Sequence, residues 1–185
     1  MTFHIAGNAP SNSLDAVTQH LSDPDVQAFL ENFDFAALAA SDAYPIHYVT
    51  LDDLLAGNLP GVPKHWRHLI VQGGAAVAEA DLAGDAVRVV AVHRGPRAAG
   101  TARAFDQAGQ LDRDYELRML EGPAIHLVSV WLHAADDDLL IPIEPDDTGL
   151  PLYQPIALSN ALPMLRNIAT QLEQDIESEP GPSGT

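Results

Sequence analysis

The segment with the clearest chemical potential joins a predicted strand to a predicted helix and reads His93-Arg94-Gly95-Pro96-Arg97. A helix N-terminus presents backbone N–H groups and a partial positive charge, so an acidic side chain is normally favoured there. Arg97 instead adds positive charge beside Arg94, and Arg103 follows further along the same helix. His93, Arg94, Arg97 and Arg103 therefore form a candidate binding site for a carboxylate or phosphate.

An alternative without a ligand exists for the same residues. Arg94 and Arg97 could pair with nearby acids, such as Asp85 or Asp106, and bind nothing. His93 falls in step with Val87, Val89 and Ala91 in a period of two, which predicts a buried, hydrogen-bonded histidine.

The densest basic and aromatic cluster is Lys64-His65-Trp66-Arg67-His68. On a helix His65 and His68 would share a face and could bind a metal ion, whereas in a strand they would point apart. No acidic third ligand stands at a motif spacing, so we predict no metal site. Because Trp and Arg anchor many interfaces, His65, Trp66, Arg67 and His68 are the candidate contact patch. The alternative is that Trp66 packs over the edge of the core.

Other polar groups give weaker signals. His126 and His133 are seven residues apart on one predicted strand, so they should face opposite sides of a sheet. Asp136 to Asp138 reads as a hairpin turn, because its spacing does not match a Ca²⁺-binding loop. Neither pattern predicts a site.

Tyr44, His47 and Tyr48 could do acid–base work near a Pro-bounded turn, but no partner acid can be assigned. The chain contains no G-x-S-x-G, Walker-type or G-x-G-x-x-G motif, and Ser129 stands between two valines on a predicted buried strand. The catalytic residues are therefore unknown, no cofactor is predicted, and a non-enzymatic role is favoured.

The elements that would position these groups follow from hydrophobic periodicity. Ser22-Asp23-Pro24 begins a helix that continues or extends through residues 36–40. Alternation predicts a hairpin with one buried face over 76–82 and 87–94, with its turn at 83–85, followed by a helix over 97–110. Further strands are predicted at 115–120, 125–134 and 139–143, and a last helix begins near Ser159 or Asn160.

This order predicts an α+β fold with an antiparallel sheet of about five strands. N-terminal helices, one helix between strands and a C-terminal helix would pack on that sheet. We predict a single domain over 1–178, made of a helical part (1–43), a sheet part (44–155) and a C-terminal helix (156–178). Residues 179–185 are predicted to be a disordered tail.

Charge separates along the 185 residues. Residues 1–62 carry eight acids and no Lys or Arg, residues 63–118 carry eight bases and seven acids, and residues 119–185 carry eleven acids and one Arg. The net charge of −17 argues against direct nucleic-acid binding, and the lack of Cys excludes disulfides and Cys-ligated metal sites. With no signal peptide or membrane span expected, we predict a cytoplasmic protein.

Two functions from different classes fit these patterns. The leading prediction is a non-enzymatic protein-binding module of chaperone, immunity or adaptor type, whose acidic flanks would favour a basic protein partner. A homo-oligomer stays open, and no nucleic-acid or membrane partner is predicted. The alternative is a small enzyme or ligand-binding domain that accepts an anionic small molecule near His93, Arg94 and Arg97.

Overall fold

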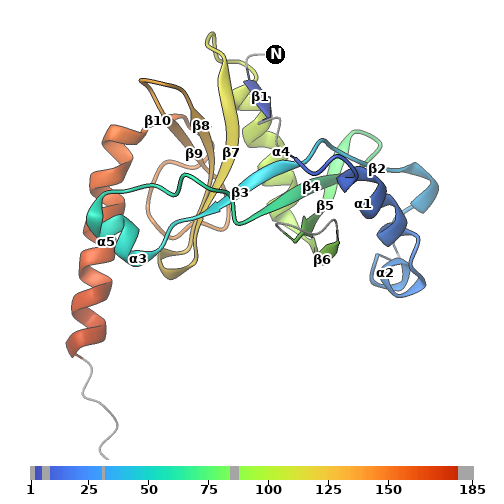
Figure 1. The fold of residues 1–185 in the computed structure, drawn as a ribbon, viewed down its shortest axis with the longest axis horizontal. Helices are drawn as coiled ribbons and strands as arrows, with labels where there is room; N and C mark the ends of the chain where they lie inside the picture. Colours follow the sequence, from blue (N-terminus) through green and yellow to red (C-terminus); the bar gives the residue numbers. More distant parts are fainter. Residues whose placement is uncertain (1–2, 6–8, 31, 84–87, 179–185) are drawn as a thin grey trace, which may run out of the picture.

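The computed structural model describes residues 3–5, 9–30, 32–83 and 88–178 (Figure 1). One large twisted sheet runs through this part of the chain. Its strands are β1 (Phe3–Ile5), β2 (Leu38–Ala40), β3 (Tyr44–Tyr48), β4 (His65–Gln72), β5 (Ala75–Leu82), β6 (Val89–Arg94), β7 (Tyr115–Gly122), β8 (Leu127–His133), β9 (Leu139–Pro142) and β10 (Ile156–Ala157). The helices are α1 (Ser13–Leu21), α2 (Pro24–Phe29), α3 (Leu51–Ala56), α4 (Pro96–Ala108) and α5 (Leu158–Ser178), with short 3-10 turns η1 (Phe35–Ala37) and η2 (Pro123–Ile125).

The sheet is mixed, with the strand order β10-β9-β8-β7-β3-β4-β5-β6. The β3–β7 and β1–β7 pairs are parallel, and the other pairs are antiparallel. β1 and β3 share one edge of β7, and β2 and β3 share one edge of β4. β6 is the last strand on one side of the sheet, so its outer edge is open.

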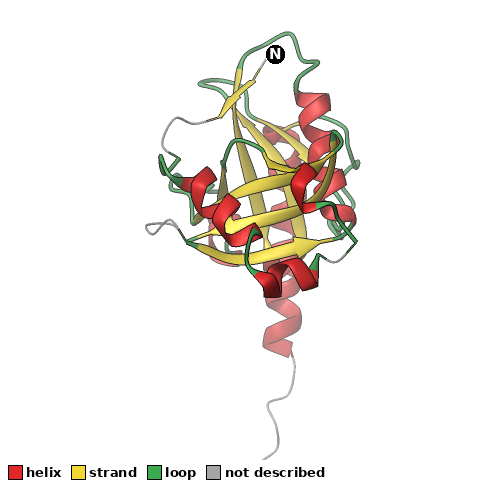
Figure 2. Cartoon of the chain, turned by 90° about the vertical axis from the view of Figure 1, so that its right-hand side faces the viewer, coloured by secondary structure: helices red, strands yellow, loops and turns green. Residues whose placement is uncertain are grey.

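Three apolar clusters hold helices against the two faces. α4 packs on one face, over Ile46, Leu117, Met119 and Val130. On the opposite face α3 and α5 cover Leu120 and the strands near it, while α1 covers Trp66, Ile70 and their neighbours. Figure 2 looks at the α1 and α2 end, with α5 receding behind the sheet. Strand alternation produces this layering, because successive side chains point to opposite faces.

The helix start predicted at Ser22-Asp23-Pro24 is confirmed, and a second helix also begins at a side-chain cap. Asp23 accepts a hydrogen bond from the Asp25 amide at 2.8 Å, and Pro24 opens α2. Thr50 and Asp53 form a reciprocal capping box at the start of α3, which Gly57 ends in the left-handed region at φ 74°.

The predicted α+β class and C-terminal helix are confirmed, but two expectations of the architecture were wrong. The sheet is mixed and has ten strands in the described residues, not about five antiparallel ones. Residues 36–40 do not extend a helix, since they form the end of η1 and then β2, which pairs with β4. The short Ala-rich run at 36–40 is compatible with a helix or with a strand, and its pairing with β4 selects the extended conformation. Residues 84 and 85 of the predicted hairpin turn (83–85), the start of the predicted strand at residue 87 and the predicted tail at 179–185 lie outside the described residues. None of the described helices combines the length and the hydrophobicity that spanning a bilayer requires.

Candidate functional site

A groove opens at the side of the sheet where β6 ends before its neighbour β5 does. The last register pair joins Ala78 to Arg94, so β5 residues 75–77 continue without β6 beside them. The chain turns away at Gly95, whose φ of 122° favours glycine, and enters α4. The groove has a volume of about 720 Å³. Its lining residues are Phe29, Asn32, Phe33, Ala76, Val77, Val92, His93, Arg94 and Gly95.

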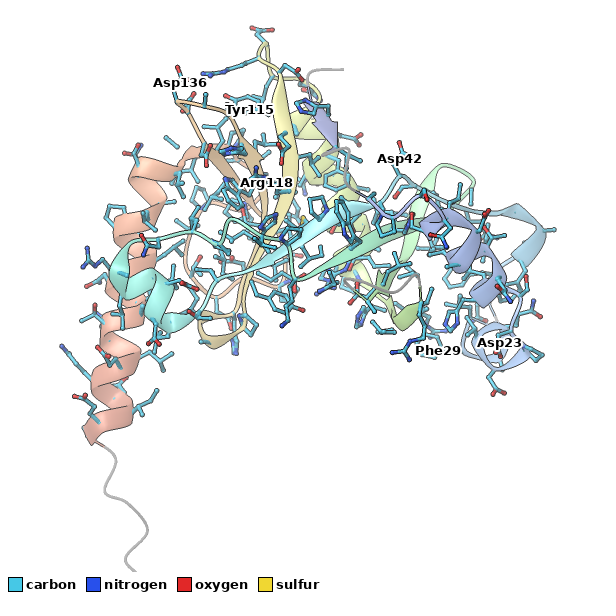
Figure 3. All side chains as sticks on the ribbon, in the orientation of Figure 1. Asp23, Phe29, Asp42, Tyr115, Arg118 and Asp136 are labelled. Carbon is cyan, nitrogen blue, oxygen red and sulfur yellow. The ribbon has the colours of Figure 1, made fainter. Side chains whose placement is uncertain are left out.

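Phe29 and Arg94 form one wall of this groove. The Arg94 guanidinium lies 4.9 Å from the centre of the Phe29 ring, and one of its N–H groups donates to the Phe29 carbonyl oxygen. This double contact ties the end of α2 to the end of β6. Phe29 nevertheless stays 49% exposed, and its side chain is labelled in Figure 3.

A cluster of buried charges lies on the α4 face of the same strands. Arg67 is 1% exposed and donates two hydrogen bonds to Asp81, from Nε to Oδ1 and from Nη2 to Oδ2 at 3.2 Å. Its Nη1 donates to Glu121 Oε1 at 2.6 Å and lies 3.7 Å from Glu79 Oε2. One guanidinium therefore sits among three carboxylates from two strands.

The N-terminal half of α4 packs over this cluster and contributes Arg97 and Thr101 to it. Arg97 Nε donates to Glu79 Oε2 at 2.7 Å, and the Thr101 hydroxyl donates to Glu79 Oε1 at 2.9 Å. From β3, the Tyr44 hydroxyl donates to the same Oε1 at 3.3 Å. Glu79 is thus 1% exposed with both oxygens hydrogen-bonded, as a buried carboxylate requires.

Strand register explains how distant residues meet here. Arg67 of β4 lies opposite Asp81 of β5, and Glu79 is two residues from Asp81 on the same face. Glu121 comes from β7, on the other side of β3. The hairpin was therefore wrongly expected to bury one face only. Its acidic face is also buried, because Arg67 and Arg97 compensate the carboxylates that the alternation assigned to solvent.

Burial and neighbouring charges shift the pKa values of two groups in this cluster, Asp81 and Tyr44. Burial raises the pKa of Asp81, but the His65 ring and the Arg67 guanidinium outweigh burial and hold that pKa well below its usual range. Burial also raises the pKa of Tyr44, with the Glu79 carboxylate adding to the effect. With neutral histidines, two arginines face three carboxylates, which leaves the cluster with one net negative charge.

His93 belongs to both the groove and the charged cluster. It lines the groove, and its Nε2 lies 3.0 Å from Asp81 Oδ2. Its side chain is 46% exposed, so the prediction of a buried His93 was wrong, although the ring is hydrogen-bonded. The reason is a register shift next to Asp81 and Leu82, which breaks the alternation between Val89 and His93.

The four residues predicted to bind an anion do not meet at one place. His93 and Arg94 line the groove, whereas Arg97 pairs with Glu79 inside the charged cluster. Arg103 stacks on Tyr153, with its guanidinium 4.1 Å from the ring centre. The alternative of arginines paired with Asp85 or Asp106 also changes, because Arg97 pairs with Glu79 of β5 and lies 3.7 Å from Glu121 of β7, whereas Arg94 contacts Phe29. Asp85 lies outside the described residues.

The predicted contact patch lies in strand β4, so His65 and His68 point to opposite faces. Trp66, Arg67 and His68 are buried, and His65 is partly buried with its Nε2 3.5 Å from Asp81 Oδ2. In this structure these residues belong to the interior, and none of them lines the groove.

His126, His133 and the acids near them lie around β8 and β9 and do not join the groove or the charged cluster. His126 precedes β8 at φ 53° and lies 2.7 Å from Asp147, so it is not on the strand that carries His133. Asp138 accepts a hydrogen bond from Trp131 Nε1 at 2.8 Å and contacts His133 at 2.9 Å. Across the described ranges, no group of three or more His, Asp or Glu side chains could hold a metal ion.

The acid–base trio suggested by the sequence is divided between two faces of β3. Tyr44 belongs to the buried charges on the α4 face. His47 points the other way, where its Nδ1 lies 3.0 Å from the Pro60 carbonyl oxygen and its ring packs edge-on against Trp131. Burial lowers the pKa of His47, which keeps this ring neutral.

Sequence reasoning missed Phe29 and the three carboxylates Glu79, Asp81 and Glu121. The spacing of Val26, Phe29, Leu30 and Phe33 predicts one apolar helix face that includes Phe29, but α2 ends at Phe29 and leaves this residue 49% exposed. One signal was available in the sequence. An arginine such as Arg67 inside a strand is rarely buried without a partner, so its position indicates that acidic side chains are buried beside it.

Comparison with known families, curated proteins and solved structures finds no match for this chain.

Proposed function

We propose that this protein is a non-enzymatic binding module that holds an extended segment of a partner protein in the groove at the end of β6. The observation that carries the proposal is the sheet edge itself. β5 continues through residues 75–77 with no strand beside it among the described residues, and a lined groove occupies that position.

Backbone pairing would supply part of the binding energy. An exposed strand edge presents N–H and C=O groups that an extended peptide can pair with, which is a recurring mode of peptide recognition. The segment would lie beside β5 residues 75–77, in line with β6, where the chain itself leaves at Gly95.

An apolar anchor would supply the rest. Phe29, Phe33, Val77 and Val92 line the groove, and Phe29 is half exposed. Burial of an aromatic side chain against them stabilises a complex by about 1.5–3 kcal/mol. The partner segment should therefore carry one large apolar residue near its middle.

The charge of the groove lining predicts that the bound segment also carries an acidic residue. His93 and Arg94 are the ionisable residues of the groove lining. An acidic residue of the segment would complement Arg94, whose remaining N–H donors suit a carboxylate. The basic partner favoured by the acidic flanks stays a prediction for the rest of the surface, because charges further than about 8 Å apart are largely screened at physiological salt.

A display selection tests this function. Linear heptapeptides would be selected on the immobilised protein and, in parallel, on the variants Phe29→Ala and Leu14→Ala. Leu14 of α1 is also 49% exposed but lies outside the groove lining, so it is a matched control. We expect aromatic, acid-containing sequences to be enriched on the wild type and on Leu14→Ala, and to be lost on Phe29→Ala. Equal enrichment on all three baits, or none on the wild type, would overturn the proposal.

A further inference from the structure

The groove at the end of β6 is closed at one end by the chain itself. β5 and β6 are antiparallel and their last register pair joins Ala78 to Arg94, so a segment beside residues 75–77 lies in line with β6. At the Arg94 end this line is occupied by β6, and the chain leaves it at Gly95 to enter α4. A bound segment must therefore end or turn sharply beside Arg94. A chain terminus meets this condition without any turn.

The length of the free edge also fits a chain terminus. Among the described residues, only 75–77 of β5 lack a strand on this side. Immediately before them the chain turns at Gly73 and Gly74, which both have positive φ. The edge thus offers backbone groups to a few residues only. A long internal strand would run past it in both directions, whereas the last residues of a chain match its length.

Arg94 determines which terminus fits. Its side chain lies on the Phe29 side of the sheet, where the guanidinium is 4.9 Å from the centre of the Phe29 ring and Nη1 donates to the Phe29 carbonyl oxygen. Its Nε and Nη2 donate to no group in the part of the chain that the structure describes. Guanidinium N–H groups bind a carboxylate and repel an ammonium group. The position beside Arg94 therefore favours a carboxyl terminus over an amino terminus.

We infer that the groove binds the free carboxyl terminus of a partner protein, with the terminal carboxylate on Arg94. The inference rests on the proposed function, because it specifies the segment that occupies the same groove. The tail runs parallel to β5, since only this direction brings its carboxyl end to Arg94. Side chains of a strand alternate between faces, so one of the last two residues points to the Phe29 side and should be aromatic or branched apolar.

The probe is the pentapeptide Thr-Val-Thr-Phe-Phe with an acetylated amino end and a free carboxyl end. Phe occupies both final positions, so that one ring meets Phe29 at either alternation. The matched probe carries a carboxyl-terminal amide, which removes the charge and keeps the side chains. A third peptide has the reversed sequence Phe-Phe-Thr-Val-Thr, a free amino end and an amidated carboxyl end. Calorimetric titration of the full-length protein at pH 7.5 gives the three affinities.

For the wild type we expect the free carboxylate to bind about fivefold more tightly than the amide, the effect of an ion pair at an exposed guanidinium. The reversed peptide should bind no better than the amide. Arg94→Gln should bind the carboxylate and amide peptides equally. Arg88→Gln, at an exposed arginine that precedes β6 and lies outside the groove lining, is the matched control and should keep the wild-type preference.

Failure of the terminus inference and failure of the groove function are distinguishable. Equal affinity of the wild type for the carboxylate and amide peptides, tighter binding of the reversed peptide, or an unchanged preference in Arg94→Gln overturns the terminus inference and leaves the groove function standing. Absence of binding by all three peptides overturns the terminus inference, and the groove function with it if the end-blocked heptapeptide Asp-Thr-Val-Phe-Val-Thr-Asp also fails to bind. The amide peptide provides the comparison on the wild type even if Arg94→Gln does not fold.

Discussion

Helix α4 covers two different surfaces on one face of the sheet. Its N-terminal half, with Arg97 and Thr101, lies over the charges of Glu79, Asp81 and Arg67. Its C-terminal half, with Ala104, lies over an apolar cluster that includes Leu117 and Met119. Tyr44 joins the halves, since its hydroxyl bonds Glu79 while its ring meets Phe105 edge-on at 5.1 Å.

The two halves stabilise the fold differently. Apolar burial contributes about 25 cal/mol per Å² removed from water. Burying ions costs several kcal/mol per ion before pairing returns it, so an apolar cluster of equal size would be at least as stable. The charged half therefore adds little net stability, but it holds His93 at the rim of the groove. We infer that the apolar half maintains the fold and the charged half orients the site.

The largest loss of unfolding free energy is expected for the variant Arg67→Met, which is compared with Leu117→Ala. Loss of Arg67 leaves three buried carboxylates facing Arg97, which should cost about 3–5 kcal/mol of unfolding free energy at pH 7. Leu117→Ala should cost about 2–5 kcal/mol through the cavity it leaves. Urea denaturation at pH 7 and pH 4.5 separates the two causes.

The pH dependence should differ between these variants. Protonation of the carboxylates relieves their repulsion, so the cost of Arg67→Met should shrink at pH 4.5 while that of Leu117→Ala stays constant. In the wild type, the pKa of Asp81 is lowered by folding, so its contribution is present above about pH 4 and is lost as the pH falls further. A pH-independent cost for Arg67→Met would contradict the assignment.

A smaller effect is expected at the rim of the cluster. Arg97 is 24% exposed, so Arg97→Ala should cost roughly 1–3 kcal/mol, because Glu79 keeps its bonds from Thr101 and Tyr44. Arg103→Ala, on the same helix, removes one contact with Tyr153 and should cost about 0.5–1 kcal/mol. Thermal unfolding of both variants measures the difference. Equal losses would show that the charged half has no special requirement for Arg97.

The smallest effect concerns the other face of β4. His68 is buried, its Nδ1 lies 2.6 Å from the Ser41 carbonyl oxygen, and its Nε2 has no partner among the described residues. Burial lowers the pKa of His68, so the unfolded chain takes up its proton first. Its stabilising contribution is present above about pH 6.5 and falls by at most about 1.4 kcal/mol per pH unit below it.

Urea midpoints at pH 7.5 and 5.5 test this sign. His68→Gln should reduce the loss of stability on acidification, whereas His126→Gln, at an exposed histidine, should leave it unchanged. His47, whose pKa burial also lowers, would account for part of the remaining slope. An unchanged slope in His68→Gln would contradict the proposed burial of a neutral ring.

Local signals predicted the parts of the fold that depend on neighbours in sequence. The caps at Asp23 and Thr50 and the helix after Pro96 follow from short-range chemistry. The parallel pairing of β3 with β7 does not, because the partner residues Ile46 and Met119 are far apart in the chain. That pairing also brings Glu121 to Arg67, so the charged cluster could not be predicted either.

The candidate site shows the same division. The sequence singled out His93 and Arg94, and both line the groove. It grouped Arg97 with them because helical order places the residue nearby, yet Arg97 bonds Glu79 on the α4 face. The groove itself depends on where β6 ends relative to β5, a register that alternating residues alone do not define.

The most direct test of the groove function is an amide NMR spectrum of the ¹⁵N-labelled protein, recorded while the end-blocked heptapeptide Asp-Thr-Val-Phe-Val-Thr-Asp is added to millimolar concentration. The proposal predicts the largest shifts at Phe29, Ala76, Val77 and Arg94, which belong to the groove lining, and small shifts at α5. Peptides methylated at the central amides should lose this effect, because they cannot pair with the β5 edge. Shifts confined to other surfaces, or equal shifts with the methylated peptide, would contradict the proposal.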